Sequence, residues 1–186
     1  MRARAIDFPI EGLSDGIVRL RLMAQADLPA IAAACRDPEI SRWTRIPEDY
    51  REDDARSWFE QEAAERSRGH QLGLVVVDPR TDRLLGSVGI VHPNWTEGRC
   101  ELGYWVARAA RGRGAATRAV RLLAAWIFES LPIDRIEICA EPENAASRRV
   151  AERAGFTFEG ELRSYIVNKG TRRDMAMYSR LRDDPG

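Results

Sequence analysis

Alternating apolar and polar positions mark the predicted strands of this chain. Residues 17–23 alternate and predict a first strand. Two β-rich runs follow at 72–77 and 84–91, and the turn-forming residues 78–82 between them predict a hairpin. Residues 92–98 are expected to form a second loop. Further strands are predicted at 100–106 and 135–141, and a closing hairpin is predicted at the end of the chain.

Helices are predicted where apolar residues recur every three or four positions. They run from Asp27 to Cys35, from Asp53 or Asp54 to about Arg66, from Ala115 to about Glu129, and from Asn144 to a stop at Gly155. Residues 38–52 contain Pro38 and Pro47 and predict a loop or a short helix. The order of elements is strand, two helices, three antiparallel strands, helix, strand, helix and hairpin. This order predicts an α+β or mixed α/β fold.

The composition fits one domain spanning 1–186. The 29 basic and 29 acidic residues give a formal net charge of zero, so composition offers no case for nucleic acid or an anionic membrane as a partner. No signal peptide and no membrane span are recognised. The three cysteines are far apart and lack metal-site spacing, and only two histidines are present. We therefore expect no metal site, free thiols and a cytoplasmic protein.

The turn after strand 100–106 has the chemistry of an anion site. Gly112 and Gly114 allow backbone N–H groups to converge, and the following helix adds its unpaired N–H groups and positive dipole end. Arg111 and Arg113 supply positive charge. A nucleotide P-loop is excluded because no Lys-Ser/Thr follows, and a dinucleotide fingerprint would need a third glycine. The expected ligand is a pyrophosphate attached to an organic group.

A second motif begins at Asn144. Asn144 is a good N-cap, Ser147 lies three residues on, and Gly155-Phe156 ends the helix. A well-capped helix would account for this pattern by itself. Together with Arg111-x-x-Gly114-x-Ala116, however, the motif resembles the GNAT superfamily of N-acetyltransferases. The ending, with Glu159-Gly160 after the second motif, is similar to the RimJ/RimL-like branch, the ribosomal-protein N-terminal acetyltransferase type.

The resemblance implies the GNAT acyl-CoA acyltransferase fold, with a central, mostly antiparallel sheet, flanking helices and a splayed parallel pair of strands carrying Val106 and Ile138. It implies acetyl-CoA as the cosubstrate. Backbone of the splayed strand would contact the pantetheine arm, the Gly-rich turn would bind the pyrophosphate, and the second motif would contact the arm again. The residues implied are Val106, Ala107, Arg111, Gly112, Arg113, Gly114, Ala115, Ala116, Thr117, Asn144 and Ser147.

Acetyl transfer to an amine needs a base and benefits from an acid for the leaving thiolate. Glu101 is the first candidate for the base, Glu159 the alternative and Glu141 the third; a solvated surface position is the competing interpretation of Glu101. Many GNAT enzymes carry an acidic Tyr seven residues after the motif Asn, but Ala151 stands there in this chain. Ser147, Tyr104, Tyr165 or water could take that role. A covalent acyl intermediate on Cys139 is the less favoured route.

The acceptor is open to several interpretations. The branch implies a peptide or protein N-terminal α-amine, attacking directly in a ternary complex. Trp43, Trp95 and Tyr165 are the candidate acceptor-binding residues, although each could equally pack in the core. A small-molecule amine such as an antibiotic or polyamine, a succinyl donor, and a CoA-binding regulator without catalysis are the alternatives. A homodimer is compatible with the resemblance.

Overall fold

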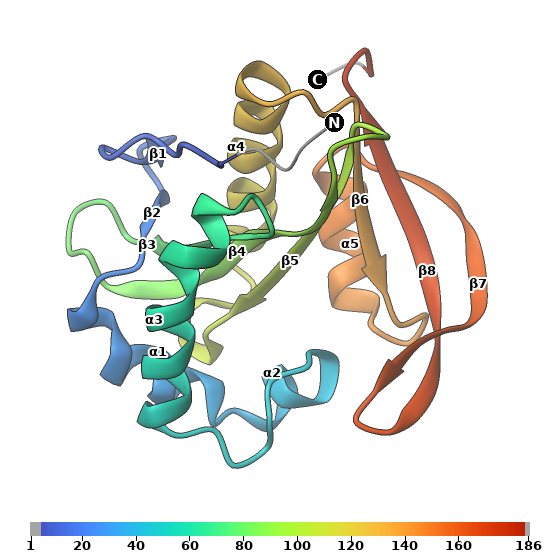
Figure 1. The fold of residues 1–186 in the computed structure, drawn as a ribbon. Coiled ribbons are helices and arrows are strands. Elements are labelled where there is room, and N and C mark those ends of the chain that lie inside the picture. The colour runs from blue at the N-terminus through green and yellow to red at the C-terminus, as the bar shows by residue number, and fades with distance from the viewer. Residues whose placement is uncertain (1–4, 185–186) are drawn as a thin grey trace.

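The computed structural model describes residues 5–184, and these form an eight-stranded sheet flanked by helices (Figure 1). The strand order is β1-β2-β3-β4-β5-β6-β8-β7, and within this part of the chain only β5 and β6 pair in parallel. The fold is therefore the α+β arrangement that the order of elements predicts. The strands are β1 (Leu13–Ser14), β2 (Arg19–Leu22), β3 (Leu72–Val77), β4 (Leu84–Asn94), β5 (Arg99–Val106), β6 (Arg135–Ala140), β7 (Thr157–Asn168) and β8 (Thr171–Leu181).

Helices cover both faces of the sheet (Figure 1). The helices are α1 (Leu28–Cys35), α2 (Pro38–Trp43), α3 (Glu52–Ser67), α4 (Ala115–Ser130) and α5 (Ala145–Arg153), with single 3-10 turns at Gln25–Asp27 and Arg108–Ala110. Val75 and Val77 of β3 pack with α1 and α3, whereas Leu72 and Leu74 join the larger core beneath α4 and α5. All of β3 is buried, as expected for a strand covered on both faces.

The parallel pair β5–β6 separates along its length. Their ladder joins only Arg99–Glu101 to Arg135–Glu137. Beyond this point β5 continues to Val106 paired with β4, and β6 continues to Ala140 paired with β8. The facing edges of β5 and β6 are therefore unpaired with each other. Buried backbone N–H and C=O groups need partners, so such an edge is suited to a ligand that carries amide groups.

Most predicted elements are found. Residues Pro38–Trp43 form a short helix with Asp37 as its N-cap, which is one of the two structures expected for 38–52. Two differences are that the short strand β1 was not predicted and that β4 extends through His92 to Asn94. His92 has a φ of 49°, and the β4–β5 register shifts between Val91 and Asn94. This bulge lets the strand continue past the proline at position 93, where a regular strand is disfavoured.

Candidate active site

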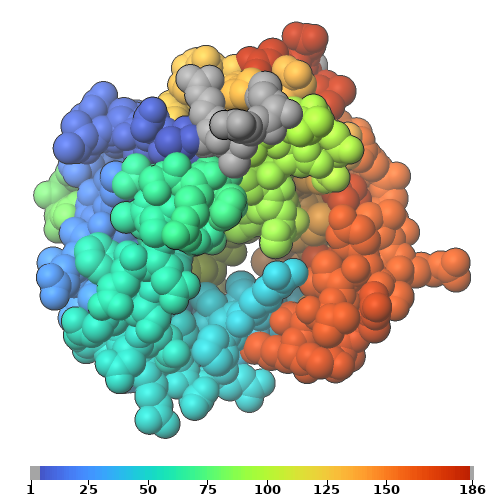
Figure 2. All heavy atoms as spheres, viewed as in Figure 1, coloured from blue at the N-terminus to red at the C-terminus, as the bar shows by residue number. Residues whose placement is uncertain are grey.

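A cavity of about 850 Å³ lies where β5 and β6 separate. Its lining comes from both halves of the sheet, from α2 and α3, from the first turn of α4 and from α5. Figure 2 shows the opening between residues near α2 and the β7–β8 hairpin. One end of the cavity is the Gly-rich turn before α4, and the other contains Trp43, Arg45 and Glu101.

The Gly-rich turn has the geometry of an anion cradle. Gly112 and Gly114 have φ values of 74° and 78°, in the left-handed region that glycine adopts without strain. A Cβ at either position would meet no atom within 4 Å, so both face open space. Gly114 is also the N-cap of α4, whose first N–H groups lack helical partners. The residues present therefore fit a bound pyrophosphate.

The guanidinium of Arg111 makes two contacts with other residues of the protein. Its Nη2 lies 2.8 Å from Asp37 Oδ2, and its Nε donates to the Val106 carbonyl at 3.2 Å. Asp37 also caps α2, because its Oδ1 accepts from Glu39 N–H at 3.1 Å. The structure thus links the Gly-rich turn to the helix on the far side of the cavity. This link was not predicted, since Asp37 and Arg111 are distant in sequence.

The predicted cosubstrate residues mostly come together. Val106, Arg111, Gly112, Gly114, Ala115, Ala116, Thr117, Asn144 and Ser147 line the cavity. Ala107 and Arg113 do not, and the Ala107 N–H is occupied by the Leu85 carbonyl at 2.9 Å. Strand pairing with β4 continues to Ala107, which leaves this N–H no freedom to contact a ligand.

The first turn of α5 and strand β5 together place two hydroxyl groups at the cavity. Asn144 Oδ1 accepts from the Ser147 N–H at 3.0 Å, as the capping pattern predicts. Ser147 Oγ lies 2.7 Å from the Tyr104 hydroxyl, and this hydroxyl donates to the Ser147 carbonyl at 3.2 Å. Burial raises the pKa of Tyr104 to about 12, although the hydrogen bond with Ser147 opposes this. The phenol is therefore protonated at neutral pH.

Glu101 faces the other end of the cavity. Because side chains alternate along a strand, Glu101 and Trp105 lie on one face of β5. Leu102 and Tyr104 lie on the other face, against the core formed with α4 and α5. Burial raises the pKa of Glu101 to about 7. The positive charge of Arg45 lowers this pKa, and the negative charge of Glu137 raises it. A carboxylate with such a pKa can accept a proton at neutral pH.

Glu159, the alternative candidate for the base, lies outside the cavity lining. It pairs with Arg135 through distances of 2.9 and 2.5 Å and accepts from Ser179 Oγ at 2.7 Å. The Arg135 guanidinium lowers the pKa of Glu159 to about 2. Such a carboxylate is a poor proton acceptor. Glu141 does line the cavity, where its Oε2 lies 3.9 Å from Arg173 Nε.

The three predicted acceptor residues have different surroundings. Trp43 lines the cavity from α2, and its Nε1 donates to Glu39 at 3.2 Å. Trp95 instead lies in the core, 7 % exposed, where its Nε1 donates to the Gly69 carbonyl at 2.8 Å. Tyr165 is 46 % exposed on β7 and does not line the cavity. Trp95 points into the core and Tyr165 points to solvent, so only Trp43 of the three lies at the cavity as predicted.

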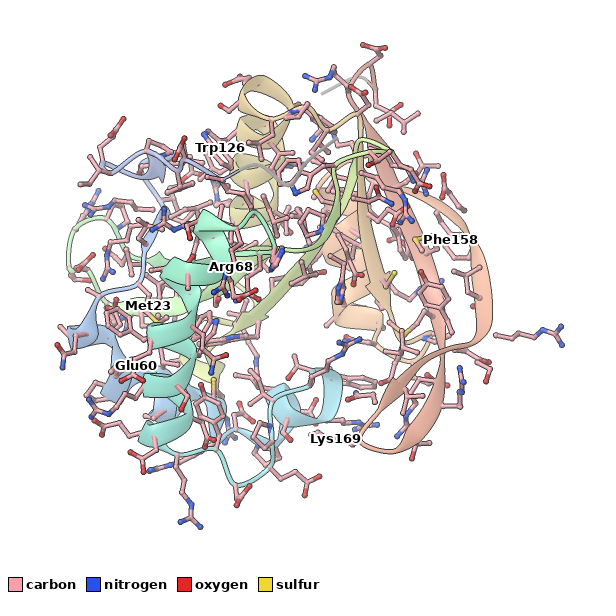
Figure 3. The ribbon with its side chains drawn as sticks, viewed as in Figure 1. Met23, Glu60, Arg68, Trp126, Phe158 and Lys169 are labelled. Carbon is pink, nitrogen blue, oxygen red and sulfur yellow. The ribbon has the colours of Figure 1, made fainter. Side chains whose placement is uncertain are left out.

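A lysine joins the turn between β7 and β8 to α2, beside the cavity. Lys169, in the turn between β7 and β8, donates from Nζ to the Ser41 carbonyl at 2.6 Å and to Ser41 Oγ at 2.5 Å (Figure 3). Ser41 lies on α2, so the two walls of the opening are joined into a ring. No local pattern in the sequence could have indicated this contact, because the two residues are 128 positions apart.

Two negative findings concern the described residues. Within 5–184 no group of three His, Cys, Asp or Glu side chains is placed to hold a metal ion. None of the helices in this part of the chain is long and apolar enough to cross a membrane.

A cavity of this build accepts a ligand with an anionic head and an extended arm of amides, next to a carboxylate that can take up a proton. That combination defines the class of CoA-dependent acyltransferases. The family model described as an acetyltransferase (GNAT) domain matches residues 18–157. The chain belongs to this family.

Individual relatives agree with this assignment. The chain is 30% identical over 173 residues to the Bacillus subtilis protein named "Putative ribosomal N-acetyltransferase YdaF", covering 89% of this chain and 91% of the relative. It is 31% identical over 163 residues to "Uncharacterized N-acetyltransferase p20" of Bacillus licheniformis, covering 88% and 92%. The predicted RimJ/RimL-like branch is thereby confirmed.

Solved structures share the fold. RimL, a ribosomal-protein α-N-acetyltransferase solved with coenzyme A, superposes with a TM-score of 0.83 at 20% identity, covering 95% of this chain and 100% of RimL. The microcin self-immunity acetyltransferase MccE, solved with acetyl-CoA and AMP, gives a TM-score of 0.84 at 22% identity, covering 94% and 98%. The chain is an acetyl-CoA-dependent N-acetyltransferase, as the sequence motifs predicted.

Proposed function

We propose that this enzyme acetylates the N-terminal α-amine of a peptide or protein, in the cytoplasm, with residues 1–186 acting as one catalytic domain. The single observation that carries the proposal is the cavity, which connects the anion cradle to a second opening ringed by α2 and the β7–β8 hairpin. A ring of this kind accepts the end of an extended chain, because a terminus can enter without the rest of the polypeptide passing through. The names of YdaF and RimL support the same acceptor class.

Each part of the cavity has a role in this proposal. The backbone of the Gly-rich turn and of the first turn of α4 binds the pyrophosphate, and the cavity edge of β5 with Asn144 and Ser147 holds the arm. Bound acetyl-CoA supplies an activated thioester carbonyl. Trp43 and Arg45 form part of the wall beside the acceptor.

Glu101 handles the proton of the acceptor. An α-amine has a pKa of about 8, so at neutral pH much of it is protonated and cannot attack. Glu101, with a pKa of about 7, is matched to accept that proton near neutrality. The Ser147 hydroxyl, at the other side of the splay, donates a hydrogen bond to the leaving sulfur. Alignment of the two reactants in the cavity supplies much of the remaining rate.

An acceptor screen that follows CoA release tests the proposal. We expect short peptides beginning with Ser or Ala to react faster than spermidine, an aminoglycoside or free lysine. The same peptides with a blocked N-terminus are the matched control, and mass spectrometry locates the acetyl group. Turnover with a polyamine or aminoglycoside, and none with free-terminus peptides, would replace the peptide with a small-molecule acceptor. Release of CoA with succinyl-CoA but not acetyl-CoA would instead change the donor.

A further inference from the structure

The β7–β8 hairpin carries a buried amide next to its turn. Lys169 and Gly170 have φ values of 48° and 76°, the left-handed pair of a two-residue hairpin turn that follows Asn168. Val167 is 53 % exposed, whereas Asn168 is only 6 % exposed. Because side chains alternate along a strand, Ile166 and Asn168 share the face of β7 that lines the cavity.

The contact between the hairpin and α2 keeps this amide at the opening. Lys169 Nζ donates to the carbonyl and the hydroxyl of Ser41, so the turn stays against α2. Figure 3 labels Lys169 where the turn meets this helix. Asn168 is the preceding residue, and it therefore lies on the inner side of the ring that α2 and the hairpin form.

The Asn168 amide has no hydrogen-bond partner among residues 5–184. Its Oδ1 is buried without one, and its Nδ2 bonds to no other residue in this range. Buried polar groups in proteins are nearly always paired, so an unpaired one on a cavity wall points to a ligand that supplies the partner. Turning the amide about its Cβ–Cγ bond exchanges oxygen and nitrogen and breaks no hydrogen bond, so the oxygen can face that ligand.

We propose that Asn168 is a specificity-determining residue whose side-chain oxygen accepts a hydrogen bond from the first peptide N–H of the acceptor. This inference rests on the peptide acceptor of the proposed function. Glu101, which takes up the proton of the amine, lies on β5, whereas Asn168 lies beside the Lys169–Ser41 contact at the opening. With the amine at Glu101, the group that meets Asn168 is the one that follows the amine along the acceptor.

This hydrogen bond would separate peptides from other amines. A site whose buried polar group needs a partner discriminates strongly against an analogue that lacks the matching donor. Every peptide with a residue other than proline at its second position carries this N–H, whatever its sequence. Free lysine and spermidine have no peptide group beside the amine. We therefore expect peptides with proline as the second residue to react poorly.

Two acceptors that differ by one N–H test the proposal. A short peptide beginning with Ser-Ala is compared with its depsipeptide, in which an ester replaces the first amide, and kcat/KM is measured from CoA release. We expect the wild type to prefer the amide about 10-fold. Asn168→Leu keeps a branched side chain without a polar atom, and should lower this ratio to about 1 with the Kd of acetyl-CoA unchanged. Any difference in amine pKa between the two acceptors affects both enzymes alike.

Two control variants and a stability measurement accompany this comparison. Asn168→Asp keeps an oxygen that accepts hydrogen bonds, so it should retain the preference for the amide. Val167→Ala changes the exposed neighbour on the opposite face, outside the cavity lining, and should behave as wild type. Asn168→Leu should keep or raise the Tm, because it removes an unpaired polar group from a buried position.

The inference and the proposed function fail in different ways. Equal kcat/KM for amide and ester in the wild type, or an unchanged preference in Asn168→Leu, would overturn the inference alone. A lower Tm with an unchanged preference in that variant would assign the amide a structural role. Turnover of spermidine or an aminoglycoside, with none of either the peptide or the depsipeptide, would overturn the proposed function and this inference with it.

Discussion

Glu101 combines burial with a position on the cavity wall. Burial shields its carboxylate from water, and this desolvation, which raises the pKa, is the largest influence on it. Arg45 counteracts the effect from the loop after α2, while Glu137 adds to it from β6. The pKa of Glu101 therefore lies close to neutral pH.

Replacing Glu101 should therefore separate proton removal from binding. Glu101→Gln keeps the size of the side chain but cannot accept a proton, so we expect kcat to fall on the order of 10²-fold. The KM for acetyl-CoA should change little. In the wild type, activity should rise with pH through about 7 as Glu101 loses its proton, and this limb should vanish in the variant. Steady-state pH profiles provide the measurement.

A stability measurement gives an independent check on the same pKa. The folded-state pKa of Glu101 lies above its ordinary value of 4.5, so ionising this group in the folded protein is costly. That cost is absent below about pH 4.5 and fully developed above about pH 7. Glu101→Gln should accordingly gain stability relative to wild type as pH rises across this window. A constant difference between the two proteins from pH 4.5 to 8 would contradict the raised pKa.

Glu159→Gln is the contrasting variant. Glu159 is ion-paired outside the cavity, so its loss should leave kcat near the wild-type value. A large loss of kcat in Glu159→Gln, with an active Glu101→Gln enzyme, would move the base to Glu159.

The Gly-rich turn offers a second test at single residues. Gly114→Val places a β-branched side chain at a φ of 78° and in the open cradle. We expect a large loss of acetyl-CoA affinity in calorimetric titration, with the fold retained. Gly16→Val is the matched control, because Gly16 has a φ of 82° with equally open surroundings but lies outside this cavity. Equal affinities in the two variants would show that backbone strain alone, and not the cradle, is responsible.

At the scale of elements, the sequence predicts the boundaries of a helix or strand where residues of that same element determine them. Asn144 and Gly155 delimit α5 through a cap and a left-handed stop at a φ of 85°, and both were predictable from sequence. The separation of β5 from β6 followed from the family resemblance. The Lys169–Ser41 and Arg111–Asp37 contacts could not be predicted, because each joins side chains from distant elements. Trp95 illustrates the same limit, since an isolated loop tryptophan gives no indication of which way it turns.

The β7–β8 hairpin should control access of the acceptor through Lys169. Lys169→Met removes both hydrogen bonds to Ser41 while retaining much of the side-chain volume. We expect a several-fold change in the acceptor KM, an unchanged KM for acetyl-CoA, and faster amide exchange near the hairpin turn. Hydrogen exchange and initial-rate kinetics measure these effects.

Ser41→Ala provides a graded comparison. It removes the hydroxyl contact but keeps the Ser41 carbonyl, so its effect should be smaller than that of Lys169→Met. If Lys169→Met shows wild-type acceptor kinetics and exchange, then the contact has no role in acceptor access.

At the scale of the molecule, the two halves of the sheet enclose a cavity of about 850 Å³. Cys139 also lines this space, from β6, and could in principle carry an acetyl group. Burial, however, raises the pKa of Cys139 to about 12, so the thiol is protonated at neutral pH. The reactive form of cysteine is the thiolate, and we therefore expect direct transfer between the two substrates.

Kinetics with both substrates varied test direct transfer. Double-reciprocal plots should intersect, because both substrates must be bound together, and Cys139→Ser should retain activity. Parallel lines combined with an inactive Cys139→Ser enzyme would indicate a covalent acetyl-enzyme. The serine variant also keeps a small polar side chain at a partly buried position, which limits the cost in stability.

The ring formed by α2 and the β7–β8 hairpin has a consequence for when a protein could be modified. If the acceptor is a protein N-terminus, as proposed, it has to extend beyond its own globular body to pass between α2 and the hairpin and reach Glu101. A nascent chain meets this condition before it folds, and so does a mature protein with an unstructured leading segment. On this proposal, a terminus that folds early into a strand or is covered by a partner subunit should escape acetylation, whatever its first residue. In such a system, the folding and assembly of the acceptor compete with the enzyme.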